Sequence, residues 1–487
     1  MIQSIKYGSV APVVRRAKII CTVGPSVQSD EKLQRLVEQG MDAARLNLSF
    51  GEPSEHEDWI RRIRAAARAV GRNVALIADL PGPKLRLGRL VSPKVTLERG
   101  AQLRFVLDDG KRSGDAGHLP VGTRFFHDDL IRGDRVLLGD VVELEITDVK
   151  PGDAGAEVVH GGDITPHTSL HLPGMPLREG PVWEEDLRHL ELAARSDVDY
   201  IAITYVRDAA DLISVREHVE RLGKKIPLIA KIERSEAFAR LDGILGRADA
   251  VMIRRSDLGA DIAQTRVPLV QKEVVRLANN RGVPVIIATQ MLGTMVRAPR
   301  PTRAEASDVF NAVADGADGV MLSSETAVGA HPLEAMSMMD RIVCEAEREH
   351  FVRDRTHELI DYPSPFPDVT ARDAVRAAAE AEVRVIVCFT QSGHTARLVA
   401  KYRPEVPIIA FCRDERVQRR LALHWGVRCD LLEPVKDVEE MVRRVDQRLI
   451  DTGAAAMGDR IAIVYGAPVG EMGHTNSVRL HQVGSLD

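Results

Sequence analysis

The sequence is poor in aromatic residues and in cysteine. Aromatic residues make up only 4% of its 487 residues, so its cores have to be built mainly from Ala, Val, Leu and Ile. The five cysteines are widely spread and contain no Cys-x-x-Cys pair, which argues against a disulfide framework and favours buried thiols. We therefore expect a protein of a reducing compartment, by default the cytoplasm.

Long apolar runs and a strong charge of either sign are also lacking. No run approaches the roughly 18 apolar residues of a membrane span, and residues 1–18 contain no apolar signal core. The formal net charge is -5, from 66 Lys and Arg against 71 Asp and Glu. This balance is too small to indicate binding to nucleic acid or to an anionic membrane, and we expect neither partner.

Residues 18–350 alternate short β-rich runs with longer amphipathic stretches. The runs are nearly continuous in apolar residues, as in strands that are buried on both faces. Eight strands are predicted in this way: Lys18–Val23, Asp42–Leu48, Val74–Leu80, Tyr200–Val206, Leu228–Ile232, Ala250–Ile253, Pro284–Ala288 and Gly319–Leu322. Eight β-then-α units predict an α/β fold, a (β/α)8 TIM barrel made of residues 18–86 and 174–350.

Residues 87–173 interrupt this alternation after the third predicted strand. Strand-like patterns at 94–97, 102–107, 135–138 and 142–146 predict an inserted β-barrel lid rather than a long disordered loop. Residues 1–17 are an N-terminal segment, and a proline-rich break at 362–367 lies in an expected linker over 351–368. Residues 369–487 again alternate strands and helices, which predicts an open α/β domain.

Polar side chains follow most of the predicted barrel strands, at the end where (β/α)8 enzymes hold their catalytic groups. Because strand side chains alternate, Lys231 and Glu233 point the same way. Glu233 and Asp257 carry hard oxygen ligands that suit Mg²⁺ or Mn²⁺. Any one of these residues could equally form a structural salt bridge, but several cations and carboxylates at one face predict phosphoryl transfer or enolate chemistry.

Seven segments, in order along the chain, resemble those of the pyruvate kinase family. They are KIICTVGPS (18–26), GMDAARLNLS (40–49), DLPGPKLR (79–86), IAKIE (229–233), ATQML (288–292), RPTRAEASDV (300–309) and MLSSETA (321–327). The resemblance implies a barrel, an inserted lid and a C-terminal regulatory domain. It also implies transfer of the phosphoryl group of phosphoenolpyruvate to ADP, giving pyruvate and ATP in glycolysis, by a homotetramer that needs Mg²⁺ or Mn²⁺.

The same resemblance implies roles for individual catalytic residues. Lys231 would neutralise the transferring phosphoryl group, and Arg45 would grip the phosphate. Arg86 would also face the phosphate site. Thr289 would lie beside the enolate carbon and assist its protonation through water.

The metal and the substrate carboxylate would be held nearby. Glu233 and Asp257 would bind the divalent metal. The segment Arg255, Ser256 and Asp257, with its backbone amides, would hold the carboxylate of the substrate.

One substitution predicts independence from K⁺. In potassium-dependent members, side chains in the positions of Asn47, Ser49 and Asp79 hold K⁺, helped by a Glu in the position of Lys84. This sequence has Lys84 there, and it has Leu80 where those members have Thr. An ammonium group can supply the charge of the missing ion, so activity should not require K⁺. The alternative is that Lys84 is a surface residue without such a role.

Other departures from the family pattern leave alternative functions open. The family's Ala-Arg-Gly-Asp is Arg254-Arg255-Ser256-Asp257 here, and Phe50 replaces a His that contacts nucleotide in many members. The lid motifs are altered as well. The alternatives are a paralogue with another phosphoryl acceptor or keto acid, including a metal-dependent lyase that forms a pyruvate enolate, and a non-catalytic phosphometabolite sensor. The lid and Thr289 favour the kinase.

An effector site is predicted where an apolar strand meets a helix in the C-terminal domain. Thr390, Ser392, Gly393 and Thr395 combine hydroxyl groups with amides at a helix N-terminus, which suits an anion. In relatives a similar loop binds the phosphate of an allosteric sugar phosphate, so a sugar-phosphate or nucleotide effector is expected. A plain Ser/Thr helix cap is the alternative.

Overall fold

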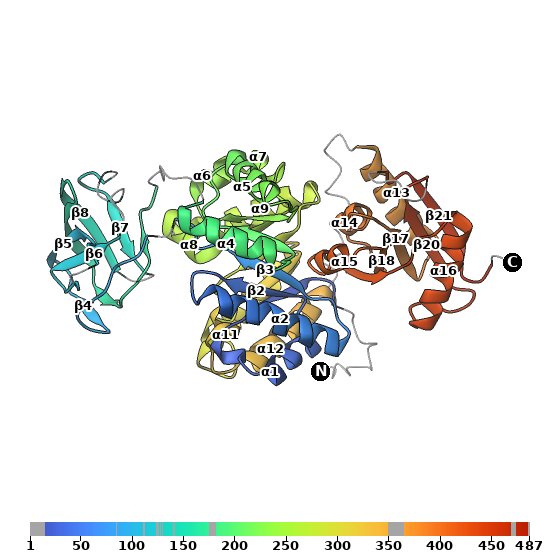
Figure 1. Cartoon of the computed structure of the whole chain (residues 1–487), viewed down its shortest axis with the longest axis horizontal. Helices are drawn as coiled ribbons and strands as arrows, with labels where there is room; N and C mark the ends of the chain where they lie inside the picture. Colours follow the sequence, from blue (N-terminus) through green and yellow to red (C-terminus); the bar gives the residue numbers. More distant parts are fainter. Residues whose placement is uncertain are drawn as a thin grey trace, which may run out of the picture.

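The computed structural model describes residues 15–83, 85–110, 113–122, 126, 128, 130–139, 142–174, 182–348, 365–468 and 474–485. Lys84 and most of the expected linker lie outside the described residues. Figure 1 shows the barrel at the centre, the inserted β domain at one end and the C-terminal domain at the other.

Eight parallel strands close the barrel, in the order β1-β16-β15-β14-β13-β12-β3-β2. Their bounds are β1 (Lys18–Thr22), β2 (Ala43–Asn47), β3 (Ala75–Asp79), β12 (Tyr200–Ile203), β13 (Leu228–Ile232), β14 (Ala250–Arg254), β15 (Val285–Ala288) and β16 (Gly319–Leu322). The predicted (β/α)8 barrel is therefore confirmed. The strand β12 ends at Ile203 rather than at the predicted Val206, because Tyr205 takes a left-handed backbone conformation with φ of 55°.

Helices surround the barrel: α1 (Asp30–Glu38), α2 (Pro53–Val70), α4 (Glu184–Arg195), α5 (Ala209–Arg221), α6 (Ser235–Ala239), α7 (Leu241–Leu245), α9 (Val267–Asn280), α10 (Arg303–Ala314) and α12 (Pro332–Arg348). Two short helices, α8 (Arg255–Asp261) and α11 (Ser324–Ala327), follow the C-terminal ends of β14 and β16. Local sequence sets their ends. At the start of α10 the Thr302 hydroxyl accepts from the Glu305 amide at 3.2 Å, and the Glu305 carboxylate accepts from the Thr302 amide at 2.8 Å. This is a capping box. The helix α2 ends at Gly71, whose φ of 70° suits glycine.

Alternate strand residues fill the inside of the barrel. Small and aliphatic side chains make up this inner cluster, among them Ala43, Ile77, Ile229 and Met252. Two residues further along each of these four strands, the inward position carries a charge: Arg45, Asp79, Lys231 and Arg254. The two-residue period of a strand thus places a charged layer directly above an apolar one, at the C-terminal end of the barrel.

The inserted domain is a curled β-sheet domain. Its larger sheet has the order β11-β7-β8-β9-β5-β6, and β10 pairs with β4. The strands are β4 (Val95–Leu97), β5 (Gln102–Leu107), β6 (His118–Val121), β7 (Arg135–Leu138), β8 (Val142–Lys150), β9 (Asp153–His160), β10 (Gly162–Ile164) and β11 (Leu170–His171). The patterns at 94–97, 102–107, 135–138 and 142–146 correspond to β4, β5, β7 and β8. Sequence reasoning missed the others, which are short or, like β9, rich in small residues.

The C-terminal domain is the expected open α/β sheet, in the order β19-β18-β17-β20-β21. It contains α13 (Phe366–Glu380), β17 (Val385–Phe389), α14 (His394–Lys401), β18 (Ile408–Cys412), α15 (Glu415–Leu421), β19 (Val427–Leu431), α16 (Val438–Asp451), β20 (Arg460–Tyr465) and β21 (Ser477–Gln482). The antiparallel edge strand β21 was not predicted. The helix α13 begins at Phe366, inside the range that we expected for the linker.

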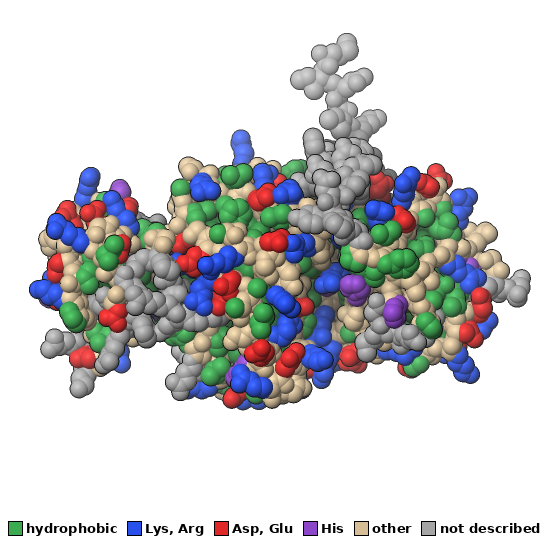
Figure 2. Space-filling view, turned by 90° about the horizontal axis from the view of Figure 1, so that it is seen from above, with side chains coloured by type: hydrophobic (Ala, Val, Ile, Leu, Met, Phe, Trp, Pro, Cys, Tyr) green, Lys and Arg blue, Asp and Glu red, His purple; other side chains and the backbone are tan. Residues whose placement is uncertain are grey.

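The C-terminal domain packs against the N-terminal ends of the barrel strands. Lys18 Nζ donates to the Val427 carbonyl at 2.9 Å, and the Tyr200 hydroxyl donates to the Arg420 carbonyl at 3.0 Å. The opposite end of the barrel, with the charged layer, therefore faces away from this domain. Basic and acidic side chains are interspersed over the face in Figure 2. Among the described residues, no helix has the length and apolar character needed to cross a bilayer.

Candidate active site

A cleft of about 1170 Å³ opens at the C-terminal ends of the barrel strands. Residues from most of the strands line it. Nine of the predicted site residues do so: Arg45, Asn47, Ser49, Asp79, Leu80, Arg86, Lys231, Ser256 and Thr289. The structure thus brings together side chains that lie more than two hundred residues apart in the sequence.

A buried string of alternating charges begins at the floor of the cleft, where Arg45, Asp79 and Lys231 line it, and continues to Glu233, which does not line it. Arg45 Nε lies 2.6 Å from Asp79 Oδ2, and Lys231 Nζ lies 3.1 Å from Asp79 Oδ1. The Lys231 ammonium also lies 3.2 Å from Glu233 Oε1. Burial raises the pKa of Asp79, but the charges of Arg45, Lys231 and Arg254 outweigh this effect and hold that pKa below its usual value. Asp79 therefore stays ionised at neutral pH.

Lys231 is held by three oxygen partners. Besides Asp79 and Glu233, its ammonium donates to the Thr204 hydroxyl at 2.7 Å, and this hydroxyl in turn donates to the Leu80 carbonyl at 2.6 Å. The Lys231 side chain is only 1% exposed. An ammonium has three N–H donors, so these contacts fix its position at the base of the cleft.

Glu233 and Asp257 share two neighbours, Tyr205 and Arg254. Tyr205 donates its amide to Glu233 Oε2 at 2.8 Å and its hydroxyl to Asp257 Oδ1 at 3.5 Å. Arg254 contacts both carboxylates, with Nε 2.8 Å from Asp257 Oδ2 and Nη1 3.5 Å from Glu233 Oε1. The Ser256 hydroxyl donates to Asp257 at 2.9 Å.

These two carboxylates fit a hard divalent cation. A single cationic group already reaches both of them, and carboxylate oxygens are the ligands that Mg²⁺ prefers. Within the described ranges, no group of three or more His, Cys, Asp and Glu could hold a metal. A metal at this pair would therefore need substrate oxygens or water as its other ligands, as is usual for Mg²⁺ in phosphoryl-transfer sites.

Thr289 follows β15 in a strained conformation, with φ of 69°, and Gln290 follows with φ of 53°. The Thr289 hydroxyl accepts from the Ser256 amide at 3.2 Å. Arg255 supports this turn from behind, because its guanidinium donates to the Thr289 and Gln290 carbonyls at 2.8 and 3.1 Å and to Asp308 at 2.7 Å. The predicted carboxylate-binding segment thus divides: Ser256 lines the cleft, while the Arg255 side chain positions the turn.

Arg86 lies at the boundary between the barrel and the lid. Its Nη1 donates to the His167 carbonyl at 3.1 Å, and its guanidinium lies 5.8 Å from the centre of the Phe50 ring. The Phe50 side chain is 65% exposed and lines the cleft. At the rim of the cleft, the Phe50 ring therefore contacts the Arg86 guanidinium. Phe50 is one of the positions where the sequence departs from the pyruvate kinase pattern.

The residues expected around a monovalent cation lie beside Arg45. Asn47 Oδ1 accepts from the Ser49 amide at 3.4 Å, and the Leu80 side chain is buried. Both oxygens of Asp79 are engaged, by Arg45 and Lys231. Lys84 lies outside the described residues.

Sequence reasoning missed Thr204, Tyr205 and His171. The first two follow β12 at the same end of the barrel as the other site residues. The search for polar side chains directly after each predicted strand (the strand-end rule) would have found them if the predicted strand had ended at Ile203. His171 belongs to the lid, and its Nδ1 lies 3.4 Å from the Tyr205 hydroxyl. Only the fold brings it to the barrel.

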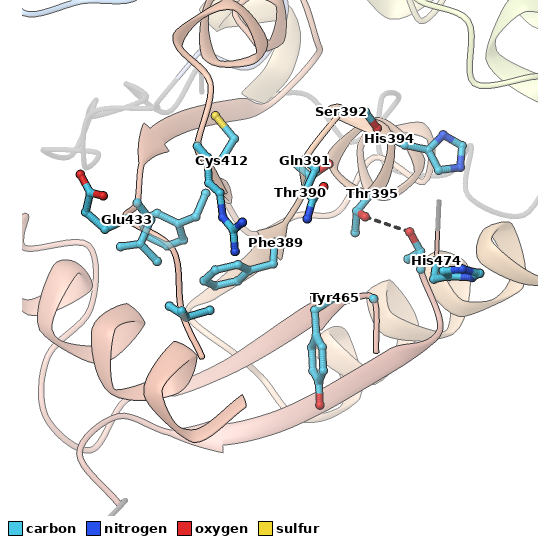
Figure 3. Close-up of a pocket in the computed structure, with 16 residues that line it drawn as sticks. Phe389, Thr390, Gln391, Ser392, His394, Thr395, Cys412, Glu433, Tyr465 and His474 are labelled. Atoms are coloured by element: carbon cyan, nitrogen blue, oxygen red, sulfur yellow. Dashed lines mark hydrogen bonds between the residues drawn. The ribbon is translucent and has the colours of Figure 1, made fainter. Parts of the chain in front are cut away.

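A second pocket, with a volume of about 60 Å³, lies in the C-terminal domain between β17 and the start of α14 (Figure 3). Thr390, Ser392 and Thr395, three of the residues predicted for an effector site, line it. Gly393 turns the chain with φ of 88°, and its amide donates to the Thr390 hydroxyl at 2.9 Å. The Thr395 hydroxyl contacts that of Thr475 at 2.8 Å. The predicted residues therefore form one loop around a pocket.

Comparison with known proteins agrees with this geometry. Family models described as "Pyruvate kinase, barrel domain" and "Pyruvate kinase, alpha/beta domain" match residues 14–336 and 368–481. A pyruvate kinase of Corynebacterium glutamicum is 41% identical over 473 residues, covering 96% of this chain and 98% of the relative. One of Mycobacterium tuberculosis is 38% identical over 476 residues, covering 98% and 100%. One of Geobacillus stearothermophilus is 39% identical over 480 residues, covering 97% and 81%. The chain therefore belongs to the pyruvate kinase family and is a phosphotransferase.

Proposed function

We propose that this protein is a pyruvate kinase that transfers the phosphoryl group of phosphoenolpyruvate to ADP and releases pyruvate and ATP. The observation that carries the proposal is the contact of Lys231 with both Asp79 and Glu233 at the floor of the cleft. This contact places Lys231, a cation suited to stabilising the transferring phosphoryl group, next to Glu233, a carboxylate suited to binding the metal. Phosphoryl transfer requires mainly such positioning and charge stabilisation.

Cationic side chains surround the proposed position of the phosphoryl group that is transferred. The P–O bond to the enolate oxygen breaks while a terminal oxygen of ADP forms the new bond to phosphorus. Lys231 and Arg45 stabilise the negative charge that spreads over the phosphoryl oxygens in this step. Arg86 contacts the phosphate from the rim, where it also joins the barrel to the lid.

Glu233 and Asp257 would hold the divalent metal, Mg²⁺ or Mn²⁺. When bound, the metal supplies Lewis-acid stabilisation of negative oxygen atoms. The amides of Ser256 and Asp257 orient the substrate carboxylate, and Arg255 keeps the adjoining turn in place. The enolate left after transfer takes a proton at its terminal carbon, which Thr289 assists through water.

K⁺ is not required for this activity. The support is that both oxygens of Asp79 already contact cationic side chains, and that Leu80 offers no side-chain ligand. Lys84 supplies the positive charge that a bound K⁺ would otherwise bring. The support for this role is the sequence, which has Lys84 where potassium-dependent members have Glu.

The pocket of Figure 3 is the effector site, and a sugar phosphate or nucleotide is its ligand class. The hydroxyl groups of Thr390, Ser392 and Thr395 provide donors for a phosphate group. The protein works as a homotetramer in the cytoplasm, and its five free cysteines accord with a reducing compartment.

Ligand-induced thermal shift tests the proposed function. Phosphoenolpyruvate with Mg²⁺ should raise the melting temperature, and ADP should raise it further, because each ligand stabilises the folded state that binds it. A pyruvate-enolate lyase would respond to the keto acid and the metal without a further effect of ADP. A sensor would respond to a sugar phosphate alone, and either result would overturn the proposal.

A further inference from the structure

The side chain of Arg254 occupies an unusual place between the two proposed metal ligands. Its Nε lies 2.8 Å from Asp257 Oδ2, and its Nη1 lies 3.5 Å from Glu233 Oε1. The carboxylates are almost fully buried, with side-chain exposures of 5% and 0%, while the Arg254 side chain is 25% exposed. The resemblance described above places Ala at this position, where this chain has Arg254.

The contact completes a string in which positive and negative side chains alternate: Arg45, Asp79, Lys231, Glu233, Arg254 and Asp257. Three cations face three carboxylates, so the formal charge of the string is zero. A divalent cation that entered alone would have to displace the guanidinium and would leave two uncompensated positive charges in a buried site. An anion that carries a phosphate and a carboxylate would compensate them.

We propose that Arg254 is an internal counter-ion of Glu233 and Asp257, which keeps the affinity for a divalent metal low until the anionic substrate binds. The proposal rests on the proposed function, because it uses the metal ligands and the substrate assigned there. Arg254 is a positioning residue. Its guanidinium and the metal compete for the same carboxylate oxygens of Glu233 and Asp257. The negative charge of the bound substrate allows the metal and the guanidinium to be present in the site together.

Direct binding of Mn²⁺ to the full-length protein tests the proposal without any turnover. The free Mn²⁺ signal in electron paramagnetic resonance gives its Kd in the absence of substrate. Arg254→Met keeps the length of the side chain and removes its charge, so we expect the Mn²⁺ Kd to fall at least about tenfold. Phosphoenolpyruvate without metal should bind this variant at least about tenfold more weakly, because one cation of the site is gone.

Opposite shifts of the two affinities separate this role from a structural one, since a damaged site would bind both ligands more weakly. Arg254→Lys keeps the charge but not the two-nitrogen contact, so both affinities should shift in the same directions as in Arg254→Met and by less. Arg216→Met is a matched control, because Arg216 pairs with Asp249 at 2.8 Å on the outside of the barrel. It should change neither affinity.

Each outcome has one meaning. An unchanged or higher Mn²⁺ Kd in Arg254→Met would overturn the role of Arg254. A double variant, Arg254→Met with Asp257→Asn, separates a wrong role for Arg254 from a wrong assignment of the metal ligands. Loss of Mn²⁺ binding in the double variant supports Asp257 as a ligand. Retained Mn²⁺ binding there would place the metal elsewhere and overturn the metal assignment within the proposed function as well.

Discussion

Lys231 Nζ lies 3.2 Å from Glu233 Oε1, so the cation proposed to meet the phosphoryl group also contacts a proposed metal ligand. Lys231 lies in β13 and Glu233 directly follows it. Because the two residues are two positions apart, their side chains point to the same side, into the barrel. A rigid strand therefore sets the spacing between the two charges, and we expect changes at either residue to affect the other.

Lys231→Met should lower kcat by about 10³-fold, because it deletes a charge that stabilises the transition state. The fold should persist, since Asp79 keeps its contact with Arg45. Steady-state kinetics and circular dichroism measure the two effects. Lys225→Met, at an exposed position far from the cleft, is the control and should leave kcat unchanged. Substantial activity in Lys231→Met would remove Lys231 from the mechanism.

Ser256→Gly should lower the KM for phosphoenolpyruvate by about fivefold, near 1 kcal/mol. We expect the Ser256 Cβ to crowd the proposed carboxylate pocket, because the family pattern has Gly at this position, where the backbone can approach the substrate more closely. Ser256→Ala keeps the Cβ but removes the hydroxyl that donates to Asp257 at 2.9 Å. If Ala lowered KM as much as Gly does, the hydroxyl rather than crowding would be responsible.

Activity should be equal in buffers whose monovalent cation is K⁺ or tetramethylammonium. Lys84→Glu removes the proposed internal cation and should create a dependence on K⁺, with activity in tetramethylammonium lowered by at least about tenfold. Added K⁺ should restore it. An original protein that is inactive without K⁺ would show that Lys84 has no such role.

Stability should fall on mild acidification because of His424. Burial, with the nearby charges of Arg397 and Lys18, lowers the pKa of His424 to about 3. An unfolded histidine has a pKa of about 6.5, so the unfolded state binds the proton first and stability is lost as the pH falls below that value. This histidine should cost about 2 kcal/mol between pH 7 and pH 5. Urea melts of the original protein and of His424→Gln measure the difference, and equal pH dependence in both would contradict the assignment.

Sequence patterns predicted the barrel well because its strands are buried on both faces and read as nearly continuous apolar runs. The strand-end rule then found Arg45, Asp79 and Lys231, which the cleft brings together. The same reasoning could not find the contact of Arg254 with Glu233, because it depends on how far a long side chain reaches across two strands. Nor could it assign Arg255 to the support of the Thr289 turn, since its partner Asp308 lies in a distant helix.

Incubation of the protein with phosphoenolpyruvate, ADP and Mg²⁺, with pyruvate and ATP measured separately, tests the proposed phosphoryl transfer itself. A pyruvate kinase should form both products at the same rate and in equal amounts, and omission of ADP should stop the formation of pyruvate. Pyruvate without ATP, or no reaction of phosphoenolpyruvate at all, would contradict the proposal.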